Sequence, residues 1–383
     1  MEFELAEDQR LIEDSIGRLM ADRYNFAARQ RYQSEPHGWS DAIWRDYAAL
    51  GLLGLPFDER YGGLSCGATE VMLVMEAIGR TLALEPYFAT VILAGGILRH
   101  GASDDQCRSI VPEMIAGRLT MSLAHSEPGA RYNLASVATN AQLNGNGWIL
   151  NGVKSLVFQG DSAGKLIVSA RTSGAPANEN GIGLFLVDSS AAGVSRQGHA
   201  MQDGCRAATI HLEDVRVPAQ DVIGDPDKGF WLLSRVIDEA IAALCAEAVG
   251  AMAALHELTV EYLKQRRQFG VAIGSFQGLQ HRAVDMLIAL EQARSMALFA
   301  TVKAGVDDPQ ERTTSMSAAK VQIGRSARLI GEQAIQLHGG IGMSMEYIGG
   351  HYLKRLTMID LMFGDADHHL RKLARAGGLS GTD

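Results

Sequence analysis

The sequence is poor in the features that mark several large classes of protein. No run of Lys or Arg exceeds two residues and the formal net charge is -9, so a nucleic-acid partner is not indicated. No apolar run approaches ~18 residues and no signal-peptide pattern is visible, so we expect neither a membrane span nor secretion. The few cysteines form no C-x-x-C pair, which argues against a disulfide framework and fits a cytoplasmic protein. They are Cys66, Cys107, Cys205 and Cys245.

Nucleotide-binding and metal-binding motifs are also missing. Neither G-x-G-x-x-G nor a P-loop occurs anywhere in the chain. His338, His368 and His369 lack the spacing with which two histidines on a helix share a metal ion, so we expect no metal site. Aromatic residues make up only 6%, so the core depends on aliphatic side chains. Hydrophobic residues nevertheless reach 47%, which is ordinary for a chain that buries a large core.

The residue pattern changes twice along the chain. Residues 1–120 show helical periodicity. Residues 121–230 contain short β-type segments with turn signals, among them NGNG at 144–147, a strong hairpin pattern. Residues 231–383 return to long amphipathic helices such as 281–304. We therefore predict an α+β fold with an N-terminal helical domain, a central antiparallel β-sandwich or barrel, and a C-terminal domain like a four-helix bundle.

One carboxylate stands out in the C-terminal part. Glu247 is the single charged residue of the apolar stretch 240–255, which is buried nearly all round if it is helical. Desolvation makes a carboxylate a usable general base near neutral pH. The alternative is a structural glutamate held by a hydrogen bond or an arginine, because ion pairs also bury carboxylates. The residues alone leave both interpretations open.

Three further segments have the composition of a ligand site. RRQFG at 266–270 and SFQ at 275–277 offer guanidinium groups, an aromatic ring and amides. QLHGGIGMS at 336–344 has glycines that let backbone N–H groups approach an anion. SLAHSEPGA at 122–130 places a hydroxyl and backbone groups at a turn. Taken singly, each is more typical of an ordinary helix end, loop or turn than of a ligand site.

In their order along the whole chain, these segments resemble the acyl-CoA dehydrogenase family. The resemblance implies bound FAD and α,β-dehydrogenation of an acyl-CoA thioester to a 2-enoyl-CoA in fatty acid metabolism. It also implies a separate electron acceptor similar to an electron-transfer flavoprotein. The matching segments are LxEDQ (5–9), GLLGLPFDERYGG (51–63), S-E-P-G (126–129, where the family usually has T-E-P), WILNGVKSLV (148–157), LEDVRVPAQDVIG (212–224), YLKQRRQFGVAIGSFQGLQH (262–281) and QLHGGIGMSMEY (336–347).

The resemblance implies two groups of FAD contacts. The residues that match flavin-ring neighbours are Leu123, His125, Ser126, Leu156 and Val157. In the family a neighbouring subunit grips the adenine and pyrophosphate. The residues that match this grip are Arg266, Gln268, Phe269, Gln277, Gln336, Leu337, Gly339 and Gly340. A site shared in this way implies a homotetramer, or a heterotetramer with a paralogous subunit.

The chain departs from the family where the catalytic base is expected. Most members carry a Glu in a Y-E-G-T motif, and Phe363 takes that place here. Others carry it at the position of Ala240. Glu247, two helical turns further on, has the A-E-A-x-G context of heteromeric members that act on steroid side-chain or dicarboxylic acyl-CoAs. Glu247 is therefore the first candidate for the base and Asp365 the second. Two other departures are Ile241 for a common Arg and Phe158 for a common ring-contacting Thr.

Two other functions stay open at this point. A non-catalytic subunit that completes the FAD site of a paralogous chain would explain the missing Y-E-G-T glutamate. A flavin oxidase or monooxygenase can be built on the same scaffold. The identity of the acyl group is open too, although the replacement by Phe363 and the low aromatic content favour a long or bulky one.

Overall fold

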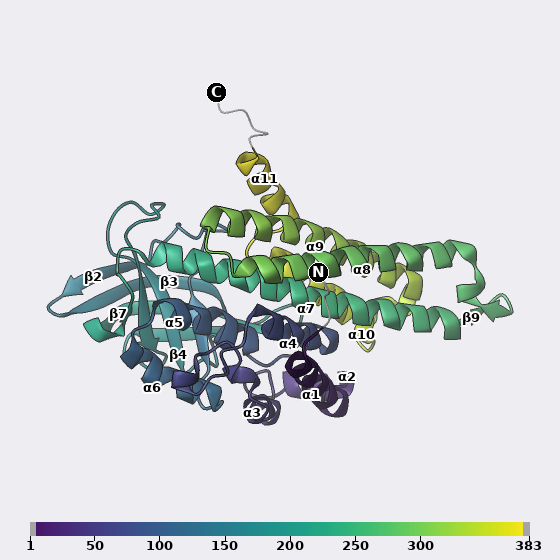
Figure 1. Cartoon of the computed structure of the whole chain (residues 1–383), viewed down its shortest axis with the longest axis horizontal. Helices are drawn as coiled ribbons and strands as arrows, with labels where there is room; N and C mark the ends of the chain where they lie inside the picture. The colour runs from purple at the N-terminus through teal and green to yellow at the C-terminus, as the bar shows by residue number, and fades with distance from the viewer. Residues whose placement is uncertain (1–4, 378–383) are drawn as a thin grey trace. The chain divides into compact units, whose positions relative to one another are not determined.

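The computed structural model describes residues 5–377 and follows the predicted order of helices, β-sheet and helices (Figure 1). This order confirms the predicted fold class, while the ends of the predicted domains at 1–4 and 378–383 lie outside the described residues. The main helices are α1 (Glu7–Arg23), α2 (Phe26–Gln33), α3 (Asp41–Ala49), α4 (Ala68–Thr81), α5 (Gly95–Gly101), α6 (Asp104–Ile115), α7 (Gly229–Gln265), α8 (Gln277–Ala304), α9 (Pro309–His338), α10 (Ile348–Leu361) and α11 (Ala366–Ala376). The strands are β1 (Met121–Ala124), β2 (Asn140–Asn144), β3 (Gly147–Phe158), β4 (Lys165–Arg171), β5 (Ile182–Asp188), β6 (Val194–Ala200), β7 (Arg206–Pro218), β8 (Val222–Ile223), β9 (Arg267–Gln268) and β10 (Val271–Ala272).

The chain folds into two compact units, and each unit takes segments from separate parts of the sequence. Among the described residues, the first unit contains 5–30, 68–83 and 241–377. The second contains Arg31–Gly67 and Leu84–Ala240. This division into two units does not test the three predicted domains, 1–120, 121–230 and 231–383, so they stay a prediction.

Close helix packing explains the small residues around Glu247 in the first unit. A Cβ added to Gly79 of α4 would lie 1.9 Å from the carbonyl oxygen of Glu247 on α7. A Cβ added to Gly250 of α7 would lie 1.9 Å from the carbonyl oxygen of Glu76 on α4. Each glycine therefore lets the backbone of the other helix approach, and any larger side chain at either position forces the two helices apart.

The long helices α8 and α9 run antiparallel beside each other in the same unit (Figure 1). The turn between them ends with Asp308, whose carboxylate accepts hydrogen bonds from the N–H groups of Gln310 at 2.8 Å and Glu311 at 3.4 Å. Pro309 occupies the first turn, where its missing N–H is no loss. At the far end, Arg282 Nη1 of α8 donates to Gln333 Oε1 of α9 at 3.2 Å. The start of α8 and the end of α9 are thus neighbours.

The second unit is built on one eight-stranded sheet with the order β6-β7-β3-β2-β4-β5-β8, and β1 pairs with β4 off this path. The predicted NGNG hairpin is present: β2 and β3 pair up to Asn144 and Gly147, and Gly145 in the turn has φ +62°. Most pairings are antiparallel, as the pattern predicts. However, β1 and β2 both run parallel to β4, because the β2–β3 hairpin is inserted between β1 and β4 and returns the chain to the same end of the sheet.

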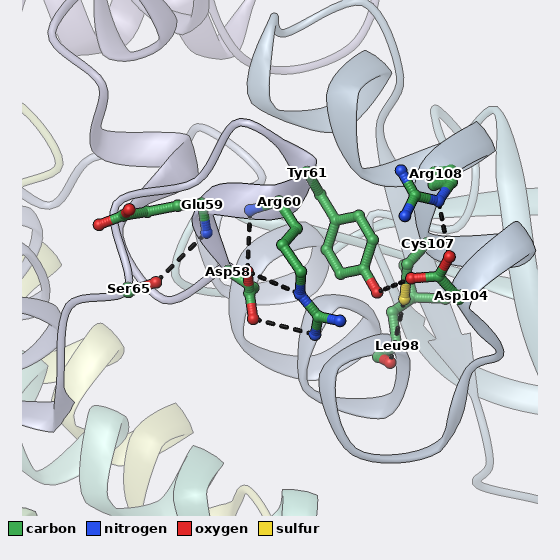
Figure 2. Close-up of polar contacts among 9 residues, drawn as sticks. All are labelled: Asp58, Glu59, Arg60, Tyr61, Ser65, Leu98, Asp104, Cys107 and Arg108. Atoms are coloured by element: carbon green, nitrogen blue, oxygen red, sulfur yellow. Dashed lines mark hydrogen bonds and ion pairs between the residues drawn. The ribbon is translucent and has the colours of Figure 1, made fainter.

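The glycine-rich segment 51–63 forms a compact loop that is fastened to α6 in the same unit. Asp58 accepts hydrogen bonds from the backbone N–H of Arg60 at 2.8 Å and from its guanidinium at 3.1 and 3.0 Å. Figure 2 shows the ring of the next residue, Tyr61, pointing to Asp104 in the first turn of α6. Its hydroxyl donates to Asp104 Oδ1 at 2.7 Å, and Arg108 Nε donates to Oδ2 at 2.6 Å. The segment thus has a structural role in this unit.

Candidate functional site

The segments assigned to a flavin ring meet at an irregularity of the sheet. β3 pairs with β7 at Lys154 and again at Val157, but only one residue of β7 faces the two residues between them. The bulge leaves Ser155 and Leu156 outside the ladder and gives Leu156 a φ of +51°. The freed N–H of Ser155 donates to the carbonyl of Ser126 at 2.8 Å. The structure therefore brings together the segments 123–126 and 156–157, which sequence matching assigned separately.

The five residues of this group differ in exposure. The side chain of Leu156 is exposed, at 59%, whereas those of Leu123 and Val157 are buried at 2% and 1%. His125 and Ser126 are half-buried. Burial and the nearby ammonium of Lys154 lower the pKa of His125 to about 4, so its ring is neutral at pH 7. The surface formed here is mainly apolar, with a neutral imidazole and a hydroxyl beside it.

A buried ion pair lies behind this surface. Lys154 Nζ, which is inaccessible to solvent, donates to Glu127 Oε1 at 2.6 Å and to Ser169 Oγ at 3.1 Å. Glu127 also accepts from the backbone N–H groups of Ala138 at 2.7 Å and Thr139 at 3.0 Å. Burial lowers the pKa of Lys154 to about 8, although Glu127 opposes the effect. The carboxylate and the ammonium thus have several hydrogen bonds in place of water.

Glu247 lies in α7 as predicted and is almost fully buried, with 2% of its side chain exposed. Arg355 of α10 donates to both of its oxygens, Nε to Oε1 at 2.6 Å and Nη2 to Oε2 at 2.8 Å. The arginine is itself only 10% exposed. The sequence left open whether Glu247 is a general base or a glutamate held by a hydrogen bond or an arginine. The structure contains the ion pair with an arginine. The pair presents Glu247 as a carboxylate away from bulk water, and its role as a base stays a prediction.

The loop after α10 places Phe363 and Asp365. Phe363 has φ +58°, which costs a bulky residue about 1–2 kcal/mol. The neighbouring structure holds it there: His369 Nε2 donates to the Phe363 carbonyl at 3.2 Å, and Lys320 Nζ donates to the last carbonyls of α10. Asp365 caps α11, because its Oδ1 accepts from the N–H of His368 at 2.7 Å. This second candidate base thus has a structural task at a helix terminus.

The residues assigned to the adenine side form an exposed hairpin between α7 and α8. β9 and β10 pair across a turn at Phe269, which has φ +55° and is 90% exposed. Its ring contacts that of Phe276 edge-on, at 6.2 Å between centroids. Arg266, Gln268 and Gln277 are exposed on the same hairpin and the start of α8. Four of the predicted contacts therefore share one small surface.

The remaining assigned residues lie at the end of α9, beside the start of α8. Gln336 is exposed, whereas Leu337 is buried at 5%. Gly339 has φ +65°, and a Cβ added to it or to Gly340 would meet no atom within 4 Å. The ring of His338 contacts those of Tyr262 and Tyr347 in tilted arrangements, at 4.6 and 5.1 Å between ring centroids. The turn is thus backed by aromatic rings and open on its outer side.

Sequence reasoning missed three charged residues of these sites: Glu127, Lys154 and Arg355. A signal existed for the first two, because each is a lone charge in a segment otherwise typical of a buried turn or strand. Arg355 offered no comparable signal, since it follows Lys354 in a helix with several polar residues. Among residues 5–377, no cluster of three His, Cys, Asp or Glu has the arrangement of a metal site. In the same range, no helix has the length and hydrophobicity needed to cross a membrane.

Comparison with known proteins places this fold in a class. Family models described as the N-terminal, middle and C-terminal domains of acyl-CoA dehydrogenase match residues 6–118, 122–215 and 227–378. The helical, β and helical segments are thus those of a three-domain flavoprotein fold. The chain belongs to the acyl-CoA dehydrogenase family of FAD-dependent oxidoreductases.

Individual relatives match nearly the whole chain. Probable acyl-CoA dehydrogenase YngJ of Bacillus subtilis (strain 168) is 29% identical, over 98% of this chain and 99% of the relative. Among solved structures, PigA with FAD and proline has a TM-score of 0.91 at 28% identity over the full length of both chains. A chain from a variant of the Tcur3481–Tcur3483 steroid ACAD has a TM-score of 0.87 at 25% identity, covering 98% of this chain and 99% of that one.

Proposed function

We propose that the chain catalyses FAD-dependent α,β-dehydrogenation of an acyl-CoA thioester to a 2-enoyl-CoA. The electrons then pass to a separate protein similar to an electron-transfer flavoprotein. One observation carries the proposal: the Ser155–Ser126 hydrogen bond of 2.8 Å joins the two segments assigned to the flavin ring. Family membership supplies the reaction class, and PigA, at 28% identity, was solved with FAD.

The residues of the β-sheet unit fit a flavin ring. Leu156 offers an exposed apolar face at the bulge, and Ser126 offers a hydroxyl and backbone groups for the polar edge of the ring. His125 is neutral at pH 7, so it adds no charge beside them. When bound there, FAD supplies the acceptor for the hydride that leaves the substrate.

The exposed surface of the helical unit fits the other half of the cofactor. Arg266 and Gln268 carry N–H donors suited to a pyrophosphate, and the exposed Phe269 ring can stack on a base. At Gly339 and Gly340 the backbone is open to a close ligand. We assign this surface to the FAD of a neighbouring subunit, as the resemblance implies.

We assign removal of the substrate α proton to a carboxylate oxygen of Glu247. A C–H next to a thioester is weakly acidic, so the reaction needs a base and hydrogen bonds to the thioester carbonyl. Glu247 lies in an apolar helix with 2% of its side chain exposed, so the surrounding side chains keep bulk water away from it, and Arg355 fixes the orientation of both its oxygens. Asp365 is the weaker candidate, because its carboxylate caps α11.

Anaerobic titration of the FAD-loaded protein tests this proposal. Short, branched, long and bulky acyl-CoAs are added in turn while the flavin absorbance is followed. We expect at least one of them to bleach the flavin, and Glu247→Gln to keep FAD but lose the bleaching. Glu257→Gln is the matched control, since Glu257 lies on the same helix in an exposed pair with Arg80.

The outcomes separate the assignments. Unimpaired bleaching by Glu247→Gln overturns Glu247 as the base and turns attention to Asp365. No bleaching of the wild-type flavin by any acyl-CoA overturns the reaction itself. Rapid oxygen consumption with substrate and no added acceptor identifies an oxidase or monooxygenase instead.

A second candidate function is a non-catalytic partner subunit in a heteromeric enzyme. The observation in its favour is that Arg355 engages both oxygens of Glu247 while Phe363 stands at the usual position of the base. The likeness at 25% identity to a chain from a variant of the Tcur3481–Tcur3483 steroid ACAD agrees with it. Purification of the chain alone decides: a yellow, active oligomer opposes this function, and a colourless chain that requires a co-expressed partner supports it.

Either function requires assembly with other subunits, and we propose a homotetramer or a heterotetramer. α8 carries exposed apolar side chains at three- and four-residue spacing, a pattern suited to packing against another helix. Analytical ultracentrifugation measures the assembly, and a monomer at micromolar concentration would contradict it. The exposed residues of this stripe are Val284, Leu287, Ile288, Phe299 and Val302.

A further inference from the structure

The buried pair of Glu127 and Lys154 connects four segments of the sheet unit. The carboxylate accepts one hydrogen bond from Lys154 and two from backbone N–H groups at the approach to β2, at 2.6, 2.7 and 3.0 Å. The ammonium adds a bond of 3.1 Å to Ser169 on β4. Glu127 itself follows β1, and Lys154 is the last residue of β3 that is in register with β7 before the bulge. The pair therefore fixes the position of the bulge relative to the segment that follows β1.

These two segments are the ones assigned to the flavin ring. Glu127 directly follows Ser126, and Lys154 directly precedes Ser155. The backbone bond between Ser126 and Ser155, at 2.8 Å, joins the residues next to the ion pair, and Ser155 is followed by the exposed Leu156. A shift of either charged side chain therefore moves the backbone beside the proposed ring position.

We propose that Glu127 and Lys154 are positioning residues for the flavin: their ion pair sets the distance between the two backbone segments that border the ring. The inference rests on the proposed binding of FAD at this surface. A role in stability alone explains the pair poorly, because two well-packed apolar side chains at such a place are often as stable. Apolar side chains lack directional bonding, whereas here three polar groups, two backbone N–H groups and the Ser169 hydroxyl, bond to the two charges.

Substitutions test this inference on the FAD-loaded protein. The variants are Lys154→Met, Glu127→Gln, and the double variant Glu127→Leu/Lys154→Met, which removes both charges and so leaves neither one buried alone. Val187→Ala is the matched control: it deletes buried methyl groups on β5, in the same core, at a residue that belongs to neither segment. The readouts are the dissociation constant of FAD, the visible circular dichroism of the flavin, its midpoint potential, and kcat and KM for an acyl-CoA.

We expect all three variants to weaken FAD binding at least tenfold and to change the visible circular dichroism. We expect kcat to fall at least tenfold, with KM changed less than threefold. Val187→Ala is expected to lower the Tm and leave the flavin readouts as in the wild type. If the single variants do not fold, the double variant decides, since it has no unpaired buried charge.

A double variant that folds and keeps the wild-type FAD affinity, circular dichroism and potential overturns the inference and leaves the proposed function intact. A control that changes the flavin readouts as much as the variants also overturns it, because the effect is then one of stability. A wild-type protein that binds no FAD overturns both this inference and the proposed function.

Discussion

Arg355 and Glu247 form a two-point ion pair inside the helical unit, with N···O distances of 2.6 and 2.8 Å. The paired geometry is the strongest that an arginine makes with a carboxylate. It is also buried, with 10% of the arginine and 2% of the glutamate side chain exposed. Removal of either partner leaves the other charge in a poorly solvated place, which costs about 3–5 kcal/mol.

A double-mutant cycle on this pair measures the interaction. We expect Arg355→Met and Glu247→Leu each to lower the free energy of unfolding by about 3–5 kcal/mol. The double variant is expected to lose less than the sum, by about 0.5–3 kcal/mol. The exposed pair Arg80–Glu257, at 43% and 59% side-chain exposure, is the control, with a coupling below about 1 kcal/mol. Equal coupling in the two pairs, measured by denaturant unfolding, would contradict the assigned burial.

A glycine at the crossing of α4 and α7 and an exposed glycine on α1 should respond in opposite ways to substitution by alanine. Gly79→Ala places a methyl group against the carbonyl of Glu247, so we expect a loss of about 1–3 kcal/mol in the free energy of unfolding. Gly17→Ala, on the exposed face of α1 with no atom within 4 Å, is expected to gain about 0.5–1 kcal/mol from helix propensity. Thermal unfolding of both variants checks the signs. A neutral Gly79→Ala would show that the helices separate at no cost.

His369 predicts how stability responds to acid. Burial, with the nearby charge of Lys320, lowers the pKa of His369 to about 3, whereas an unfolded histidine titrates near 6.5. Between about pH 6.5 and 3 the unfolded chain therefore binds the proton that the folded chain excludes, and stability falls by up to about 1.4 kcal/mol per pH unit. His369→Gln is expected to remove this contribution, so its stability declines less steeply than that of the wild type below pH 6.5. Parallel curves from pH 8 to pH 4 would refute the burial of this ring.

We predict that removal of the exposed Phe269 ring weakens FAD binding without destabilising the fold. Its ring is 90% exposed, so Phe269→Ala should change the free energy of unfolding by less than about 0.5 kcal/mol. A base stacked on an aromatic ring contributes about 1–3 kcal/mol, so FAD affinity should fall about tenfold or more. Leu143→Ala, 68% exposed at the end of β2, is the control and should retain FAD. Equilibrium dialysis measures both, and unchanged affinity would remove Phe269 from the adenine site.

Local patterns carry most of the fold. The periodicity of 281–304 becomes α8, the apolar stretch around Glu247 becomes part of α7, and NGNG becomes the β2–β3 turn. These features depend on residues close in sequence, which is why composition and spacing reveal them. The parallel pairing of β1 with β4 has no such local origin, because it depends on where the intervening hairpin returns the chain.

Less of the candidate site can be predicted from the sequence, because its contacts join residues that are far apart along the chain. The sequence identifies Glu247 as an unusual buried carboxylate, but its partner Arg355 is 108 residues away and has no distinguishing neighbours. Asp365 looks like an ordinary loop carboxylate in the sequence, and only the start of α11 shows it to be a cap. The pairing of Glu127 with Lys154 likewise requires the bulge in β3, which no residue pattern announces.

The parallel pairing of β1 has a consequence for the growing chain. Met121–Ala124 finds its partner only when Lys165–Val168 has been made, 44 residues later in register. At about 5–20 residues per second, the nascent chain spends roughly 2–9 s with this apolar strand unpaired. During that interval the β2–β3 hairpin can form by itself. The Lys154 side chain stays hydrated until β4, which carries its partner Ser169, has paired. The segments that we assign to the cofactor are therefore completed late in the synthesis of the sheet.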